Sequence, residues 1–182
     1  MNKFLYFMFF LGTMLIVSCG SSRNVTSYKK TNHSKTNRKS SSTNMIYRSY
    51  HVNDASKESK SILRIAKSFI GTPYKYGGNN ASGFDCSGLV MVSFDHLGFK
   101  LPRNSAQQAE RGKEIKVSDI KEGDLIFFNT SGNTISHVGI VESIDKSGEI
   151  KFIHSSTTKG VIISSLEENY WKARFVKAVR LL

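Results

Sequence analysis

The hydrophobic pattern changes near Gly123, from helical spacing before it to short β-type runs after it. Upstream, apolar residues recur at helical spacing over about 58–70 and 86–97, and a shorter helix capped by Asn104 or Ser105 is predicted to about Gly112. Downstream come short β-type runs divided by turn residues, at 125–128, 137–141, 150–154, 160–163 and 175–179. Helices first and a meandering sheet second predict an α+β domain, with N-terminal helices packed on a mostly antiparallel sheet.

The N-terminal segment is predicted to be a targeting signal outside the fold. Residues 4–17 are almost wholly apolar and follow Lys3, but they are fewer than the roughly 20 residues that a membrane span needs. The run Ile16-Val17-Ser18-Cys19 resembles a bacterial lipoprotein processing site. We therefore expect residues 1–18 to be a signal peptide and Cys19 to be lipidated, although an ordinary cleaved signal with an incidental cysteine is the alternative.

Residues 19–56 are predicted to form a disordered basic tether. Residues 20–60 hold nine Lys and Arg against two acidic residues, whereas residues 61–182 hold 16 basic and 12 acidic residues. Because most of the basicity lies outside the domain, the charge pattern argues against a nucleic-acid partner. A basic tether beside a lipid anchor suggests contact with anionic headgroups or an acidic envelope polymer, and a solvated spacer is equally compatible.

The remaining residues, 57–182, are long enough to form one domain, and Cys86 is its single cysteine. A lone cysteine cannot form an internal disulfide, so it is either a small core residue or a reactive thiol. A Gly- and Asn-rich loop precedes Cys86 and a helical pattern follows it. This position in the first helical turn predicts that free N–H groups and the helix dipole stabilise a thiolate.

Two histidines, His137 and His154, lie in strand-like runs and are candidates to act with Cys86. A hairpin between their strands would bring the two rings together. One imidazole could then take the proton of the thiol, and the other could orient the first imidazole. A zinc site is the alternative, but it normally has four ligands and no Cys-x-x-Cys or His-x-x-x-His pair is present. We therefore expect no metal and no cofactor.

Several motifs occur in one order along residues 58–182, and together the region resembles the NlpC/p60 family of cell-wall peptidases, most closely its Spr branch of envelope lipoproteins. The motifs are Gly71-Thr72-Pro73-Tyr74-Lys75-Tyr76-Gly77-Gly78, Phe84-Asp85-Cys86-Ser87-Gly88, Leu101-Pro102-Arg103, Gly123-Asp124-Leu125, His137-Val138-Gly139-Ile140, Phe152-Ile153-His154 and the tail from Gly160 to Ser165 with Tyr170-Trp171 beyond.

The resemblance implies a papain-like fold and hydrolysis of peptide bonds in peptidoglycan. It makes Cys86 the nucleophile, His137 the general base and His154 the residue that orients His137. It also gives the hydroxyl of Tyr74 a part in the oxyanion site.

The resemblance further places Asp85 and Ser87 at the substrate pocket. Asp85 is equally suited to cap the Cys86 helix, and the two roles are compatible. Arg103 is suited to bind a carboxylate of a stem peptide, although a surface salt bridge is the simpler interpretation.

The expected partners are therefore peptidoglycan peptides and, through Cys19, a membrane; the expected form is a monomer.

Two other functions stay open: a non-catalytic lipoprotein that binds peptidoglycan in the same cleft, and an acyl transferase or amidase with the same thioester chemistry. D-alanyl–diaminopimelate cross-links and D-γ-glutamyl–diaminopimelate stems both fit as the bond that is cut, and the resemblance to the Spr branch modestly favours the cross-links. Gly20 follows the lipidated cysteine where some lipoproteins carry an inner-membrane retention aspartate, so the expected location is the outer membrane facing the periplasm, in a cell with two membranes.

Overall fold

The computed structural model describes the backbone of residues 42–182 and the side chains from Ala55 onward. The predicted signal peptide, Cys19 and the tether up to residue 41 lie outside the described residues. Within the described part, none of the helices is both long and apolar enough to cross a membrane.

The described chain forms helices first and a sheet second, as the sequence predicts. The helices are α1 (Ser42–Ser68), α2 (Cys86–Asp95), α3 (Ser105–Gln108) and α4 (Asn169–Lys172), with the 3₁₀-helix η1 (Val117–Asp119) between α3 and the main strands. The strands are β1 (Asn79–Asn80), β2 (Gly83–Phe84), β3 (Lys113–Ile115), β4 (Leu125–Phe128), β5 (His137–Ile144), β6 (Ile150–Ser156), β7 (Gly160–Ser165) and β8 (Phe175–Arg180).

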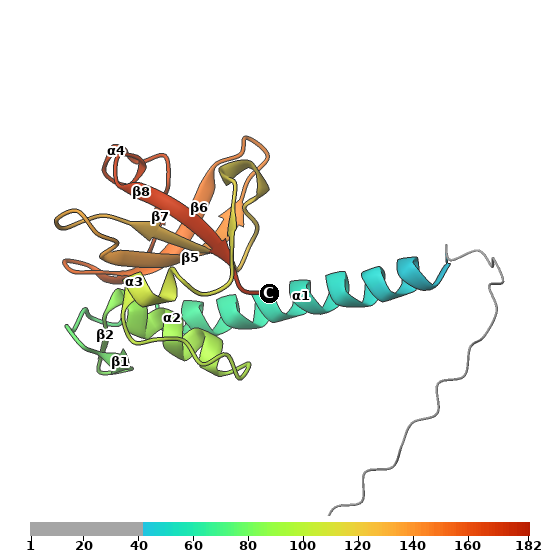
Figure 1. The fold of residues 1–182 in the computed structure, drawn as a ribbon. Coiled ribbons are helices and arrows are strands. Elements are labelled where there is room, and N and C mark those ends of the chain that lie inside the picture. Colours follow the sequence, from blue (N-terminus) through green and yellow to red (C-terminus); the bar gives the residue numbers. More distant parts are fainter. Residues whose placement is uncertain (1–41) are drawn as a thin grey trace, which may run out of the picture. The chain divides into compact units, whose positions relative to one another are not determined.

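The six-stranded sheet has the order β3-β8-β4-β5-β6-β7, and every neighbouring pair in it is antiparallel. Strands β4 to β7 form a meander, and the last strand returns to pair with β4 on its other side. Figure 1 shows α2 and the end of α1 beneath this sheet and α4 above it. The short β1–β2 hairpin lies in the loop that precedes α2.

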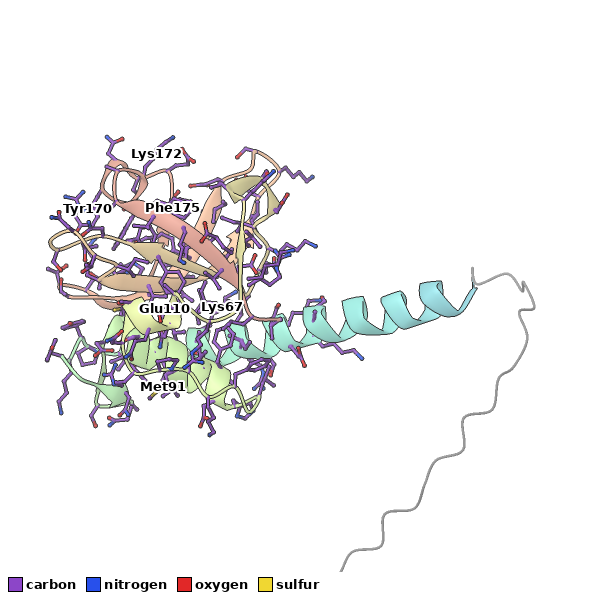
Figure 2. All side chains as sticks on the ribbon, in the orientation of Figure 1. Lys67, Met91, Glu110, Tyr170, Lys172 and Phe175 are labelled. Carbon is purple, nitrogen blue, oxygen red and sulfur yellow. The ribbon has the colours of Figure 1, made fainter. Side chains whose placement is uncertain are left out.

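The sheet separates two hydrophobic cores because successive side chains of a strand point to opposite faces. One core packs α1 and α2 against the sheet and includes Phe84, Leu89, Phe94, Phe127 and Ile140. The other lies on the opposite face, around Phe128, Phe152 and Trp171 of α4. In Figure 2, Tyr170 and Lys172 of α4 and Phe175 of β8 lie on the side of the sheet away from Met91 of α2.

The predicted α+β class is confirmed, and all five predicted β-type runs are strands. The predicted start of the first helix near residue 58 is wrong, because α1 begins earlier, at Ser42, within the segment predicted as the tether. The sequence did not predict five short elements, namely β1, β2, β3, η1 and α4. These elements have two to four residues each, too few for a hydrophobic period to be visible.

Candidate active site

Cys86 is the first residue of α2, as the sequence predicts, and Asp85 caps the helix. The Asp85 backbone is extended, and its carboxylate oxygen Oδ1 accepts the Gly88 N–H at 2.7 Å. This bond satisfies one of the free N–H groups of the first turn. Gly88 also touches the preceding loop, because a Cβ built on it would lie 2.1 Å from the Gly78 carbonyl oxygen. The helix start and the loop can therefore approach this closely only with glycine at residue 88.

Asp85 also binds Arg103, whose guanidinium makes a two-pronged contact with the carboxylate. Arg103 Nη2 lies 2.6 Å from Asp85 Oδ2, and Nη1 lies 2.9 Å from Oδ1. Nη1 also donates to the Ser87 hydroxyl at 2.9 Å, and the Gly77 N–H donates to Asp85 Oδ2 at 3.0 Å. Burial raises the pKa of the Asp85 carboxyl, but the bonds from Arg103 and Gly88 outweigh burial and the net pKa is lowered. The ionised carboxylate of Asp85 thus links the N-terminus of α2 to the loop that contains Gly77 and to the loop that contains Arg103.

The sulfur of Cys86 lies against the beginning of β5. Sγ is 4.0 Å from the carbonyl oxygen of Ser136, and the backbone N–H of Val138 also interacts with it. Ser136 and Val138 are the two neighbours of His137 in the chain, so the sulfur faces the backbone on both sides of that histidine. The fold thereby brings the predicted nucleophile to the backbone on either side of the predicted base, which lies 51 residues further along the sequence.

The thiol of Cys86 is nearly buried, and this burial changes the protonation state that the sequence predicts. Burial raises the pKa of the thiol and the Asp85 carboxylate raises it further, while the N–H groups of Val138, Ser87 and Cys86 itself oppose them. The net pKa is raised, so the predicted resting thiolate is wrong: the N–H donors are present, but they do not compensate for lost hydration. Cys86 is a neutral thiol at rest.

His137 and His154 form a hydrogen-bonded pair, as the predicted hairpin requires. They lie on the adjacent strands β5 and β6, and His137 Nε2 is 3.0 Å from His154 Nδ1. The second nitrogen of His154, Nε2, is 3.0 Å from the hydroxyl oxygen of Ser164 on β7. Because Nε2 of His137 is occupied by this pair, Nδ1 is the ring nitrogen that stays free to exchange a proton with a nucleophile.

Trp171 covers both imidazole rings and was missed as a site residue. Its ring stacks on His137 at 5.1 Å between centroids and meets His154 edge-on at 4.7 Å. Trp171 is itself 9% exposed, so the indole separates the histidine pair from solvent. The sequence does contain a signal, since Trp171 is the single tryptophan of the chain. Its helix α4, however, has four residues and no predictable pattern.

Burial keeps both imidazoles neutral. It lowers the pKa of His137 to about 4, and together with the adjacent His137 it lowers the pKa of His154 to about 3. A neutral imidazole is the form that can accept a proton from a thiol. The resting site therefore pairs a neutral thiol with a neutral base, and a proton must move when the sulfur attacks.

These two pKa values predict that the fold loses stability in mild acid. At a pH between the folded-state pKa values and the unfolded-state pKa near 6.5, the histidines bind more protons in the unfolded chain than in the folded one. The contribution of the two neutral rings to the free energy of unfolding is therefore complete above about pH 6.5 and decreases as the pH falls. From pH 6.5 to pH 5 we expect the free energy of unfolding to fall by about 2 kcal/mol for each ring.

The measurement is the free energy of unfolding by urea at each pH. His154→Gln should flatten the pH dependence, whereas replacing the exposed His96 by Gln should not; an unchanged slope in His154→Gln would contradict the assignment.

Tyr74 lies in the loop before α2, half-buried beside the same site. It pairs with Phe84 through a single β-bridge, and the loop is fixed to β7 because the Gly71 N–H donates to the Val161 carbonyl at 2.9 Å. Partial burial and the nearby groups of Cys86 and Asp85 raise the pKa of Tyr74. The phenol therefore keeps its proton near neutral pH and is available as a hydrogen-bond donor.

Among the side chains that the structure describes, residues 55–182, no group of three or more His, Cys, Asp or Glu is arranged to hold a metal ion. Two surface hollows lie away from Cys86. One, of about 390 Å³, is lined by residues of the α3 region, and the other, of about 720 Å³, lies along β3, η1 and the C-terminal residues.

The structure thus gathers all the predicted site residues of the domain around the N-terminus of α2. Cys86 faces the residues that flank His137, His137 binds His154, and Asp85, Ser87 and Arg103 bind one another. The contacts of Asp85, Ser87 and Arg103 are to one another and to the loops beside them, and their assignment to substrate binding stays a prediction. The lipidation site Cys19 lies outside the described residues.

The chain is similar to known proteins over this same region. It is 44% identical over 117 residues to the probable endopeptidase NlpC of Escherichia coli K12, covering 63% of this chain and 73% of that protein. It is 43% identical over 113 residues to the murein DD-endopeptidase MepS/murein LD-carboxypeptidase of the same organism, covering 62% of this chain and 57% of that protein.

A solved structure supports the fold. The peptidoglycan hydrolase RipB of Mycobacterium tuberculosis superposes with a TM-score of 0.58 at 26% identity, over 71% of this chain and 67% of that one. The NlpC/P60 family model matches residues 71–180, which include every residue of the site described above. This match covers more than half of the sequence, and the chain therefore belongs to the NlpC/P60 family.

Proposed function

We propose that the chain is a peptidoglycan endopeptidase, a cysteine hydrolase that cleaves peptide bonds containing D-amino acids. The observation that carries the proposal is the position of the Cys86 sulfur against the residues that flank His137, whose ring is hydrogen-bonded to His154. The names of the relatives support the substrate class, since they include an endopeptidase, a murein endopeptidase and a peptidoglycan hydrolase.

In the first step the Cys86 sulfur attacks the carbonyl carbon of the scissile bond and its proton passes to Nδ1 of His137. Because the resting pair is neutral, proton transfer and attack are coupled. A bond forms between sulfur and carbonyl carbon, and the carbon–nitrogen bond then breaks as His137 returns the proton to the leaving amine. The product of this step is a thioester on Cys86 and a free amine.

In the second step water attacks the thioester. His137 takes a proton from the water and the sulfur leaves, regaining a proton to restore the thiol. The negative charge on the carbonyl oxygen is stabilised in both steps by the Tyr74 hydroxyl and the Cys86 backbone N–H, and such donors typically contribute about 3 kcal/mol each. The raised pKa of Tyr74 supports this role, because a protonated phenol can donate.

Asp85 and Arg103 support catalysis by fixing the N-terminus of α2, because the carboxylate that caps this helix is bound by the Arg103 guanidinium. The Arg103 side chain is still 40% exposed, which leaves a face of the guanidinium open to a peptide carboxylate. The Ser87 hydroxyl lies beside them and completes the proposed substrate contacts.

The test is incubation of the full chain with purified peptidoglycan, followed by separation and mass analysis of the released muropeptides. The proposal predicts new amine and carboxyl ends at bonds that contain D-amino acids, and the masses identify whether cross-links or stems are cut. Binding to peptidoglycan with no cleavage product would instead support a non-catalytic binding lipoprotein. A parallel incubation with phospholipid vesicles covers the third function: release of acyl groups there, with the muropeptides left intact, would support an acyl transferase or amidase.

We further propose that Cys19 is lipidated and that the monomeric enzyme is anchored in the cell envelope, in the outer membrane facing the periplasm where two membranes exist. The support is the apolar run that ends at Ile16-Val17-Ser18-Cys19 and the absence of an aspartate after Cys19. Incorporation of labelled palmitate into the wild-type chain and its loss in Cys19→Ala would support the anchor. Equal incorporation in both chains would contradict it.

A further inference from the structure

Ser164 has a buried hydroxyl group that is hydrogen-bonded to His154, the second histidine of the pair. It lies on β7, opposite Phe152 of β6, with its side chain 8% exposed. Its Oγ is 3.0 Å from Nε2 of His154, and among residues 55–182 this is the one side-chain hydrogen bond that Ser164 makes. The three groups form a line in which Ser164 meets His154 and His154 meets His137.

This line admits two proton arrangements, because a neutral imidazole has one N–H and one lone pair. In the first, His137 donates from Nε2 to His154 Nδ1, and His154 donates from Nε2 to the Ser164 oxygen. In the second, Ser164 donates to His154 Nε2, His154 donates from Nδ1 to His137 Nε2, and His137 carries its proton on Nδ1. Only the first arrangement leaves the lone pair of His137 Nδ1 free to take a proton from Cys86.

We propose that Ser164 is a positioning residue that accepts the His154 Nε2–H and thereby fixes both histidines as Nε2–H tautomers. This inference rests on the proposed function, since it assigns His137 Nδ1 as the base of the thiol hydrolase. Ser164 touches neither the substrate nor the sulfur and acts through His154 and then His137.

Removing the hydroxyl should reverse the arrangement. In Ser164→Ala the Nε2–H of His154 would be buried without an acceptor, and leaving a buried donor unpaired is costly. Moving the His154 proton to Nδ1 avoids this cost, but His137 must then carry its proton on Nδ1 and can no longer act as the base. His154 is 1% exposed, so bulk solvent has little access to its Nε2 as a replacement for the lost acceptor.

The direct test is the ¹⁵N NMR pattern of the histidine rings in the full chain near pH 7, recorded without substrate. The wild type should show Nε2–H for both His137 and His154, and Ser164→Ala should show Nδ1–H. Nδ1–H rings in the wild type, or an unchanged Nε2–H pattern in Ser164→Ala, would overturn the proposal. Because no substrate is present, this result stands or fails separately from peptidoglycan cleavage.

Kinetics on a muropeptide substrate give the second readout. Ser164→Ala should lower kcat by about 10- to 100-fold, because a large part of the general-base contribution of His137 is lost when its Nδ1 carries a proton, and KM should change by less than about twofold. Ser164→Thr keeps an acceptor and should restore both tautomer and kcat. The matched control is Ser165→Ala, because the hydroxyl of this neighbour on the same strand binds Glu149 at 2.7 Å instead. Equal losses in Ser164→Ala and Ser165→Ala, or a Ser164→Thr variant with wild-type tautomers and a low kcat, would overturn the inference.

Discussion

Replacing Cys86 with alanine is expected to abolish peptidoglycan cleavage and leave the protein folded. The substitution removes the atom that forms the thioester, and catalysis that proceeds through a covalent intermediate should fall by at least about 10³-fold in kcat. The Cys86 side chain is small and lies at the edge of the helix-side core, so truncation should cost only about 1 kcal/mol of stability. The measurement is muropeptide release over time, together with the urea midpoint of each protein.

His137→Ala should lower kcat by a similar factor, because the nucleophile and the base act as one unit and the effects of removing them do not add. The double variant should therefore be no slower than either single variant. Muropeptide release within about tenfold of wild type by a folded Cys86→Ala protein would contradict the covalent mechanism. Loss of the folded state in that variant would leave the mechanism to be decided by His137→Ala.

Gly88→Ala is expected to damage both the stability of the domain and the site. The added Cβ would lie 2.1 Å from the Gly78 carbonyl oxygen and 3.0 Å from Asp85 Oδ1, and a backbone carbonyl cannot move aside cheaply. This carbonyl accepts the Asp85 N–H at 3.0 Å and Arg103 Nη2 at 3.3 Å, so its displacement also breaks those bonds. We expect about 3 kcal/mol less stability and at least about a 100-fold loss in kcat, because the nucleophile is displaced.

The matched control is Gly98→Ala just beyond the end of the same helix. Gly98 has a φ of 83°, but a Cβ there would meet no atom within 4 Å. Alanine should therefore cost about 1–2 kcal/mol through backbone strain alone and leave kcat unchanged. Both variants are compared by urea unfolding and by muropeptide release. If Gly88→Ala were as active as Gly98→Ala, the close packing of loop and helix would not be what positions Cys86.

The sequence predicts those parts of the fold that carry long, regular patterns. The α2 helix, its Asp85 cap and the Asn104 cap of α3 follow from local rules, and both caps are present. The five strand runs follow from β-branched and aromatic residues between turn residues. The approach of His137 to His154 follows from a hairpin prediction that the β5–β6 pairing confirms.

Contacts set by tertiary structure could not be predicted in this way. The bond between Arg103 and Asp85 joins residues 18 apart through a loop, and no local pattern specifies it. The contact of Trp171 with the histidines needs the return of α4 over the sheet. The sign of the Cys86 pKa shift depends on how deeply the thiol is buried, which the N-terminal position in a helix does not reveal.

Formation of a thioester on Cys86 can be observed by intact-protein mass spectrometry. The full chain is mixed with a muropeptide, quenched in acid within one turnover, and its mass is measured before and after digestion to peptides. We expect a transient mass increase equal to the acyl part of the muropeptide, located on the peptide that contains Cys86 and absent in Cys86→Ala. Release of muropeptide products at the wild-type rate with no adduct on that peptide at any time would contradict thioester formation.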